Sequence, residues 1–381
     1  MSAAKRLLFL LNDAPFFVSH RLALAVAARR AGMEVHVAVP YEEGPVAAIQ
    51  AAGIQHHDYP LRRGTRGPLG ELRLIIAMAR LMREIRPDLL HCVTMKPVLY
   101  GGLLARLMKL PAVVHAVTGL GYLFLIEGAA ARLQRRFVLA LYRFALGHGN
   151  SRAIFQNPDD LELFRQHDLV DPAKVVMIRG CGVDMQIFKP QFGEAGLVVF
   201  PARIIGDKGA REFVEAARLL KQKSVAARCV LVGRTDPDNP TYISEDEIKD
   251  WQQKGDVEWW GFEDDMPALL GRAEIVCLPS YREGLPRVLI EAAASGKAIV
   301  TTDVPGCREV VTEGDNGFLL PARDGAAIAA ALERLLGDSE LRQRMGGQSR
   351  QRAVAEFSVE KFIAASLATY RAVLPSGTLG P

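Results

Sequence analysis

Two glutamates, Glu283 and Glu291, stand eight positions apart in the segment SYREGLPRVLIEAAASGKAIV, where an apolar run gives way to a helical pattern. A helix that begins at Pro286, behind Gly284, would offer unpaired amides and a partial positive charge of about half a unit, which suits a phosphate. Carboxylates repel phosphate, so both glutamates are predicted to accept hydrogen bonds from sugar hydroxyls. In the alternative interpretation Glu283 caps the helix and Glu291 is a surface charge, but the apolar residues around Glu291 weigh against it.

A second cluster, FPARIIGDKGARE, places Arg203 and Lys208 between another apolar run and a helical pattern. Arg203 offers a forked set of donors and Lys208 a mobile point charge, a combination suited to the oxygens of a diphosphate. Doubly wound folds bind ligands at the carboxyl ends of their strands, where this cluster is predicted to lie. We therefore expect both cations to face phosphate.

Neither a metal nor a cofactor is expected. Asp236 and Asp238 form a D-x-D string, but they stand among prolines and an asparagine in an ordinary loop composition, and the two cations already fill a metal's role. The five cysteines are scattered, and no pair has C-x-x-C spacing. They are predicted to be buried thiols in a reducing cytoplasm.

The elements that must position these residues alternate between short apolar runs and helical patterns. RLLFLL, a helix ending at Gly32, and EVHVAV form the first βαβ unit, and a second series starts at LVVFPA after a glycine-rich linker. The pattern predicts an α/β chain of two doubly wound, Rossmann-like domains, residues 1–190 and 191–358. Whether the last helix, residues 359–375, crosses back to the first domain or packs on its own is left open.

Charge is divided unevenly along the 381 residues: residues 1–190 carry a net charge of +9 and the remainder −5. A basic half suits nucleic acid, anionic lipid or a phosphorylated substrate, with scattered solubilising charge as an open alternative. Nucleic acid is disfavoured because the basic residues lack interleaved exposed aromatic residues. No charge-free apolar run reaches about 18 residues, so no membrane span is expected, and the apolar start is too short for a secretory signal.

Several segments together resemble a known family. Arg203 with Lys208, the E-x7-E pair, TTDVPGCREVV and GDNGFLLP look like the donor half of family 4 retaining glycosyltransferases, which have the GT-B fold of two Rossmann-like domains facing a central cleft. FFVSHRLALA, RPDLLHCVTMKP, TGLGYLF, FQNPDD and GCGVDMQIF resemble a bacterial branch that builds capsule, O-antigen and lipid-linked glycans. Within it, the chain is similar to transferases that add N-acetylgalactosamine to undecaprenyl-diphosphate-linked bacillosamine.

The resemblance implies a role for each matching residue. It implies that Arg203 and Lys208 hold the diphosphate of a UDP-sugar, that Glu291 holds the ribose hydroxyls, and that Glu283 contacts the donor sugar. It further implies that the sugar is transferred with retention of configuration at its anomeric carbon, by front-face attack and without a metal. The segments implied to line the phosphate, the sugar and the uracil are Gly284, Leu285 and Pro286, and Gly261 with Phe262.

The chain departs from the family pattern in two loops of its first half. Relatives often have histidine before the glycine of the loop Thr118-Gly119-Leu120-Gly121, where the resemblance places the sugar, and this chain has Thr118. By strand alternation His115 points to the opposite face and is predicted to be a core histidine. In the first loop, NDAPFFVSH replaces a glycine pair, and His20 is left open between acceptor, phosphate and packing roles.

For the acceptor, the resemblance implies a polyprenyl-diphosphate-linked glycan. Arginines along two helical patterns, near residues 71–86 and 129–146, could rest on the anionic cytoplasmic face of the inner membrane, and a solvated helix face is the open alternative. These arginines are Arg73, Arg80 and Arg83 in the first pattern and Arg132, Arg135, Arg136 and Arg143 in the second.

Three rival functions can be weighed against this resemblance. A dehydrogenase is disfavoured, because no predicted strand of this chain is followed by the G-x-G-x-x-G fingerprint. A nucleotide-sugar epimerase of the same fold would need no acceptor, and a non-catalytic nucleotide-sugar sensor or scaffold would bind without turnover.

Overall fold

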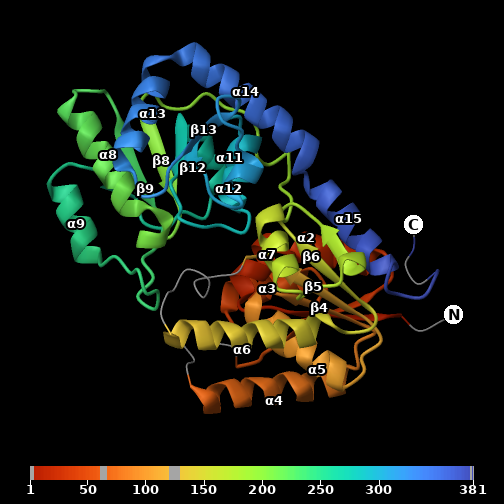
Figure 1. The fold of residues 1–381 in the computed structure, drawn as a ribbon. Coiled ribbons are helices and arrows are strands. Elements are labelled where there is room, and N and C mark those ends of the chain that lie inside the picture. The colour runs from red at the N-terminus through yellow and green to blue at the C-terminus, as the bar shows by residue number, and fades with distance from the viewer. Residues whose placement is uncertain (1–3, 61–66, 120–128, 378–379, 381) are drawn as a thin grey trace. The chain divides into compact units, whose positions relative to one another are not determined.

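The computed structural model describes residues 4–60, 67–119, 129–377 and 380, and its contacts divide the chain into two units. Unit 1 comprises Met1–Cys181 and Glu360–Pro381, and unit 2 comprises Gly182–Val359. Each unit is built on one parallel sheet, which confirms the predicted α/β class with two doubly wound domains (Figure 1). Unit 2 begins earlier than the predicted residue 191, because Val183, Met185 and Phe188 are buried in its core.

The sheet of unit 1 has seven parallel strands in the order β3-β2-β1-β4-β5-β6-β7. Its central strands β4 and β5 are buried at every position, which explains why they read as continuous apolar runs. From β1 the chain moves to β2 on one side while β4 lies on the other, so the order reverses between β1 and β4. The strands are β1 (Arg6–Leu10), β2 (Glu34–Ala38), β3 (Gln55–His57), β4 (Leu89–Val93), β5 (Val113–Val117), β6 (Ser151–Phe155) and β7 (Val175–Met177).

Side chains cap the starts of two helices of unit 1. Asp13 accepts a hydrogen bond from the amide of Phe16 at 2.8 Å, and Asn157 accepts one from the amide of Asp160 at 2.7 Å, as the Asn157-Pro158 pair predicted. Helices α4, α5 and α6 lie side by side along one face of the unit (Figure 1). The helices are α1 (Ala14–His20), α2 (Leu22–Arg30), α3 (Glu43–Ala51), α4 (Pro68–Ile85), the π-helical turn η1 (Pro97–Gly101), α5 (Gly102–Leu107), α6 (Ala129–Leu146), α7 (Pro158–Gln166), the 3-10 turn η3 (Pro172–Lys174) and α15 (Val359–Arg371).

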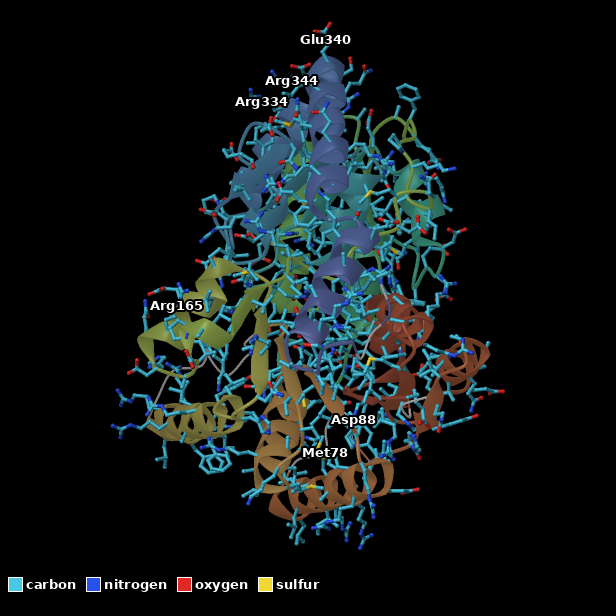
Figure 2. All side chains as sticks on the ribbon, turned by 90° about the vertical axis from the view of Figure 1, so that its right-hand side faces the viewer. Met78, Asp88, Arg165, Arg334, Glu340 and Arg344 are labelled. Carbon is cyan, nitrogen blue, oxygen red and sulfur yellow. The ribbon has the colours of Figure 1, made fainter. Side chains whose placement is uncertain are left out.

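Apolar side chains fill both faces of the unit 1 sheet, because alternate residues of each strand point to opposite sides. Met78 of α4 is fully buried in one core (Figure 2). Asp88, the residue directly before β4, accepts a hydrogen bond from Lys5 Nζ at 2.9 Å. The other core receives Phe362 and Tyr370 of α15. The final helix, whose placement the sequence left open, therefore packs on unit 1.

Unit 2 repeats this architecture with six parallel strands in the order β10-β9-β8-β11-β12-β13, and its order reverses between β8 and β11. Glu340 and Arg344 are exposed on its polar helix α14 (Figure 2). The strands are β8 (Leu197–Pro201), β9 (Arg228–Val232), β10 (Glu258–Trp259), β11 (Ile275–Leu278), β12 (Ala298–Thr302) and β13 (Gly317–Leu320). The helices are the 3-10 turn η4 (Gly206–Lys208), α8 (Ala210–Gln222), α9 (Glu245–Gln253), α10 (Met266–Arg272), α11 (Arg287–Ala294), α12 (Cys307–Val310), α13 (Gly325–Gly337) and α14 (Ser339–Glu356).

The cysteines agree with their predicted role as buried thiols. All five are free and buried, and burial raises the pKa of the Cys229 thiol to about 12. Across the described ranges, no helix has both the length and the apolar character needed to cross a bilayer.

The contact that joins α15 to the sheet gives the first prediction. Tyr370 Oη lies 2.6 Å from Nδ1 of His91, and both side chains are buried. We expect Tyr370→Phe to lower the free energy of unfolding of unit 1 by about 1–3 kcal/mol, because the imidazole nitrogen stays buried without a partner. Calorimetry that resolves the transitions of the two units measures this loss. Tyr41→Phe, at an exposed tyrosine, is the control, and an unchanged transition for Tyr370→Phe would contradict the buried hydrogen bond.

Candidate active site

The carboxyl edge of the unit 2 sheet brings the two predicted clusters together. β8 pairs with β11, and the chain leaves them in opposite directions, which creates the crevice position at which doubly wound folds bind ligands. Arg203 and Lys208 follow β8, while Glu283 and Gly284 follow β11. The amide of Tyr281 donates to the carbonyl of Asp207 at 2.9 Å and ties the two loops directly to each other.

Lys208 and Glu283 form an ion pair at this edge. Their side chains are only 21% and 11% exposed, and Ser280 Oγ also donates to the same carboxylate at 2.7 Å. The next residue, Gly209, has φ +76°, and a Cβ there would lie 2.1 Å from the carbonyl oxygen of Pro279. Only glycine therefore lets the Lys208 turn approach the β11 loop closely enough for this pair.

The loop of Gly284 is packed from a second direction by the TTDVPGCREVV segment. A Cβ on Gly306, which has φ +80°, would lie 2.6 Å from the carbonyl oxygen of Gly284. The backbone at Gly306 thus packs directly on the backbone of the loop that leads from Glu283 to α11. Leu285 is half-buried in this loop.

Pro286 is the residue before α11 rather than part of its first turn. Its φ of −72° and ψ of +112° are extended, and the helix begins at Arg287, which corrects the predicted start by one residue. Proline suits this extended position between the loop and the helix, because the amide hydrogen that it lacks would have no helical partner there. The free N-terminal amides of α11 therefore begin with Arg287.

Glu291 is buried in the second turn of α11 and is not the surface charge of the alternative interpretation. Arg287 Nε donates to Glu291 Oε1 at 2.7 Å. Burial raises the pKa of Glu291, and the Arg287 guanidinium opposes that shift. The carboxylate is thus a buried acceptor held in one orientation by its own helix.

Arg203 pairs with Asp236, the first aspartate of the D-x-D string. The first aspartate of the string is therefore the ion-pair partner of an arginine in this structure. The Arg203 side chain remains 45% exposed. Phe262 is 52% exposed, and the guanidinium carbon of Arg234 lies 4.1 Å from the centre of its ring. Gly261 before it has φ +73°, so the chain turns sharply and presents the ring beside Arg234.

The candidate residues of unit 1 are more dispersed. Thr118 and Gly119 follow β5, with Gly119 at φ +138°, and the rest of the TGLGYLF segment lies outside the described residues. His115 is fully buried, and burial lowers its pKa to about 3, which confirms a neutral core histidine. His20, in the last turn of α1, stacks on Phe16 with ring centres 4.0 Å apart and has Ser19 Oγ 2.7 Å from its Nδ1.

The structure also supplies four partners that the sequence reasoning missed: Arg287, Ser280, Asp236 and Arg234. Arg287 lies four residues before Glu291, and this i, i+4 spacing of opposite charges could have identified the pair. Ser280 lies three residues before Glu283 in the same loop, whereas Asp236 and Arg234 reach their partners only because separate loops meet in the folded chain.

A cavity of about 550 Å³ lies at the opposite, amino edge of the unit 2 sheet, and its lining includes Lys297 and Arg342. Lys297 Nζ donates to the carbonyls of Gln191 and Gly271 at 2.7 and 3.0 Å, and burial lowers its pKa to about 8. Arg342 pairs with Glu274 at 2.7 Å. Lys297 holds the segment before β8 and Arg342 the residue before β11, so the cavity is not part of the phosphate-type site.

Comparison with known proteins shows what class of protein carries this site. Residues 184–352 match the family model of glycosyl transferases group 1, and residues 6–157 match the model described as glycosyl transferase 4-like. Two doubly wound units with parallel sheets form the GT-B fold of sugar-transferring enzymes. In this chain the paired cation and carboxylate lie at the carboxyl edge of the unit 2 sheet. The two matches together span most of the chain, which is a glycosyltransferase built from domains of these two families and a hexosyltransferase.

Two relatives are similar over most of the chain. Identity is 29% to the N,N'-diacetylbacillosaminyl-diphospho-undecaprenol alpha-1,3-N-acetylgalactosaminyltransferase of Campylobacter jejuni, covering 84% of this chain and 86% of the relative. It is 26% to the UDP-Gal:alpha-D-GlcNAc-diphosphoundecaprenol alpha-1,3-galactosyltransferase of Escherichia coli, covering 76% and 77%.

Solved structures share the fold. Anabaena HepE in complex with UDP and glucose matches with a TM-score of 0.75 at 19% identity over 97% of this chain and all of that one. WaaG, a glycosyltransferase involved in lipopolysaccharide biosynthesis, matches with a TM-score of 0.71 at 16% identity over 97% of this chain and all of that one.

The Arg287–Glu291 pair gives a stability prediction with a definite pH dependence. We expect Arg287→Met to destabilise unit 2 by about 2–3 kcal/mol at neutral pH, because it leaves a buried carboxylate unpaired; the loss is below that of a fully buried pair since the arginine side chain is 24% exposed. Losing the arginine raises the pKa of Glu291 further. The penalty is therefore full above that pKa and disappears as falling pH protonates the carboxyl group.

Thermal unfolding of both proteins between about pH 8 and pH 4 measures this effect. Arg211→Met is the control, since Arg211 and Glu247 form an exposed pair that contributes little. A pH-independent difference between wild type and Arg287→Met would refute the assigned charge of Glu291.

Proposed function

We propose that this hexosyltransferase is a retaining, metal-independent enzyme that moves an N-acetylhexosamine, N-acetylgalactosamine in the simplest case, from a UDP-sugar to an undecaprenyl-diphosphate-linked glycan. The observation that carries the proposal is the Lys208–Glu283 pair beside Arg203 at the carboxyl edge of the unit 2 sheet. The relatives named above support the acceptor class and the sugar, and the UDP-bound structural neighbour supports the nucleotide.

The leaving diphosphate gains negative charge as the sugar bond breaks. Lys208 and Arg203 are cations already held by Glu283 and Asp236, so they meet that charge without first having to be ordered. Glu283 then accepts a hydrogen bond from a donor-sugar hydroxyl, next to the amides of Gly284 and Leu285. Pro286 lines the site without donating, because it has no amide hydrogen.

The nucleoside end of the donor would lie along Glu291 and Phe262. An ionised Glu291 accepts hydrogen bonds from the ribose hydroxyls, and Arg287 keeps it ionised against the effect of burial. The exposed face of Phe262 beside Arg234 suits a flat uracil ring.

Chemistry without a metal follows from these cations. We assign no carboxylate as a nucleophile: the acceptor hydroxyl attacks from the face that the diphosphate leaves, and a phosphate oxygen takes its proton. The configuration at the sugar carbon is thereby retained. In this mechanism Lys208 contributes through the charge that develops on the leaving group.

The direct test is Lys208→Ala. We expect turnover to fall on the order of a hundredfold, because a fixed cation aimed at the developing charge is removed. Transfer from a panel of UDP-sugars to short undecaprenyl-diphosphate glycans, read by mass, measures the rate and identifies the donor. Lys223→Ala is the matched control, since Lys223 forms an exposed pair with Glu333. A Lys208→Ala enzyme with near-normal turnover and an intact fold would end the assignment.

The same assay separates the two alternatives. A nucleotide-sugar epimerase would convert the donor to its epimer with no acceptor present, and a sensor or scaffold would bind UDP-sugar without any turnover. The names of the relatives favour transfer over both.

We further propose that unit 1 contacts the anionic cytoplasmic face of the inner membrane, where a lipid-linked acceptor resides. On α6, Leu133 and Phe137 are 71% and 66% exposed and lie one helical turn apart. Arg132 and Arg136 flank them, and the helix contains no acidic residue. Arg143, predicted for the same stripe, instead donates to the carbonyls of His167 and Asp168 at 2.7 and 3.1 Å.

Helix α4 adds a second stripe on the same face of unit 1 (Figure 1). Leu69, Leu72 and Ile76 are exposed at i, i+3 and i+7 spacing, with Arg73 and Arg80 beside them. Exposed apolar side chains flanked by arginines fit a helix that lies in the headgroup layer with its apolar residues inserted.

Vesicle binding tests this contact. We expect the double variant Leu133→Ser, Phe137→Ser to bind phosphatidylglycerol vesicles at least about tenfold more weakly, because two large apolar side chains are no longer removed from water. Binding should also weaken between about 50 and 500 mM salt. Phe192→Ser is the control, since Phe192 is an exposed aromatic residue of unit 2. Absence of vesicle binding by the wild type at low salt would exclude the membrane surface.

A further inference from the structure

The reversal point of the unit 1 sheet has the same topology as the donor site of unit 2. β1 and β4 are neighbours with Leu10 opposite Cys92, and the chain leaves them in opposite directions. Asn12 and Thr94 each follow two residues beyond that last pair, so they stand at corresponding positions of the carboxyl edge. Ligands of doubly wound folds bind at this edge.

Two polar atoms at this edge lack hydrogen-bond partners in the described part of the chain. Asn12 Oδ1 and Thr94 Oγ1 are both buried and unpaired. Buried polar atoms are almost always paired, since leaving one unpaired costs stability. Both side chains are nevertheless part-exposed as a whole, so the residues that carry these unpaired oxygens are within reach of a ligand.

The backbone at Thr94 is also in an unusual conformation. Its φ is +73°, in the left-handed region that β-branched residues avoid. It is held there because its amide donates to the carbonyl of Ala116 at 3.3 Å and its carbonyl accepts from the amide of Val98 at 3.0 Å. The π-helical turn η1 begins three residues after Thr94, at Pro97. Strained residues and π-helical turns are both concentrated at functional positions.

A charged group lies two residues further on. Lys96 Nζ is 2.7 Å from Glu71 Oε1 in the first turn of α4, and both side chains are about one-third exposed. Glu71 Oε2 is buried and, among the described residues, has no partner. Burial, and after it the nearby Glu71 carboxylate, raises the pKa of Tyr100, so the phenol stays protonated.

We propose that Asn12, Thr94, Glu71 and Lys96 form a subsite for the acceptor's sugar, which they recognise through its hydroxyl or acetamido N–H groups. The amide oxygen of Asn12 and the carboxylate of Glu71 can only accept hydrogen bonds, so they require a ligand that donates. The Thr94 hydroxyl can accept or donate, and the Lys96 ammonium is already paired with Glu71. A phosphate group would meet the Glu71 carboxylate and is therefore the disfavoured occupant. The proposal rests on the proposed function, because it assigns the acceptor's sugar to unit 1.

Thr94→Val tests the subsite, since valine keeps the branched shape and removes only the hydroxyl. We expect KM for the undecaprenyl-diphosphate glycan to rise about tenfold, the effect of one lost hydrogen bond to a ligand. KM for the UDP-sugar and its hydrolysis without acceptor should stay unchanged. The melting temperature should not fall, because an unpaired buried hydroxyl is replaced by a methyl group. Thr94→Ser retains the hydroxyl and should retain KM for the acceptor.

Asn12→Ala is the second variant and should raise the same KM. Unchanged acceptor KM in Thr94→Val or in Asn12→Ala overturns the subsite, as does an equal rise of both KM values.

A binding measurement separates failure of the subsite from failure of the proposed function. Saturation-transfer NMR with methyl N-acetyl-α-glucosaminide and methyl N-acetyl-α-galactosaminide reports direct contact with the protein in the absence of any turnover. Contact with the wild type that is lost in Thr94→Val supports the subsite even if no UDP-sugar is transferred. No contact with the wild type, or equal contact with Thr94→Val, overturns it.

Discussion

The ion pair of Lys208 and Glu283 is the interaction on which the donor site of unit 2 depends. Its partners are 75 residues apart in sequence and meet because β8 and β11 are neighbours in the sheet. The approach is so close that the turn after Lys208 can hold only glycine. The carboxylate fixes the ammonium before any phosphate arrives, and a charge already in place need not be reorganised during the reaction. Gly209 and Gly306 allow the backbone segments around this pair to approach one another, because a Cβ at either position would collide with a backbone carbonyl.

Much of this site could be predicted because each of its residues carries a local signal. Lys208 precedes a helix after an apolar strand, and Glu283 stands in a loop before a proline and a helical pattern. The class of fold follows from the alternation of elements, which reflects burial of parallel strands on both faces. The start of α11 differed by one residue, because Pro286 is compatible with both the last extended and the first helical position.

The remaining features depend on contacts between distant segments. The ion pair between Asp236 and Arg203 could not be inferred, since the residues around Asp236 have the composition of an ordinary polar loop. The unit on which α15 packs was equally hidden: an amphipathic pattern shows that one face of a helix is buried, but it does not identify the segment that covers it. The unpaired oxygens of Asn12 and Thr94 are visible only after every other hydrogen bond is accounted for. Sequence patterns report what a residue prefers, whereas these features arise from what its surroundings leave unmet.

The return of α15 to unit 1 has a consequence for synthesis of the protein. Phe362, Tyr370, Val373 and Leu374 complete a core whose other buried members are made before residue 182. While the chain emerges from the ribosome, this first sheet must wait with an uncovered apolar face until nearly the whole polypeptide has been translated, whereas the continuous second unit can close earlier. Loss of the last twenty or so residues, by nonsense mutation or proteolysis, would thus damage the end of the molecule that is made first.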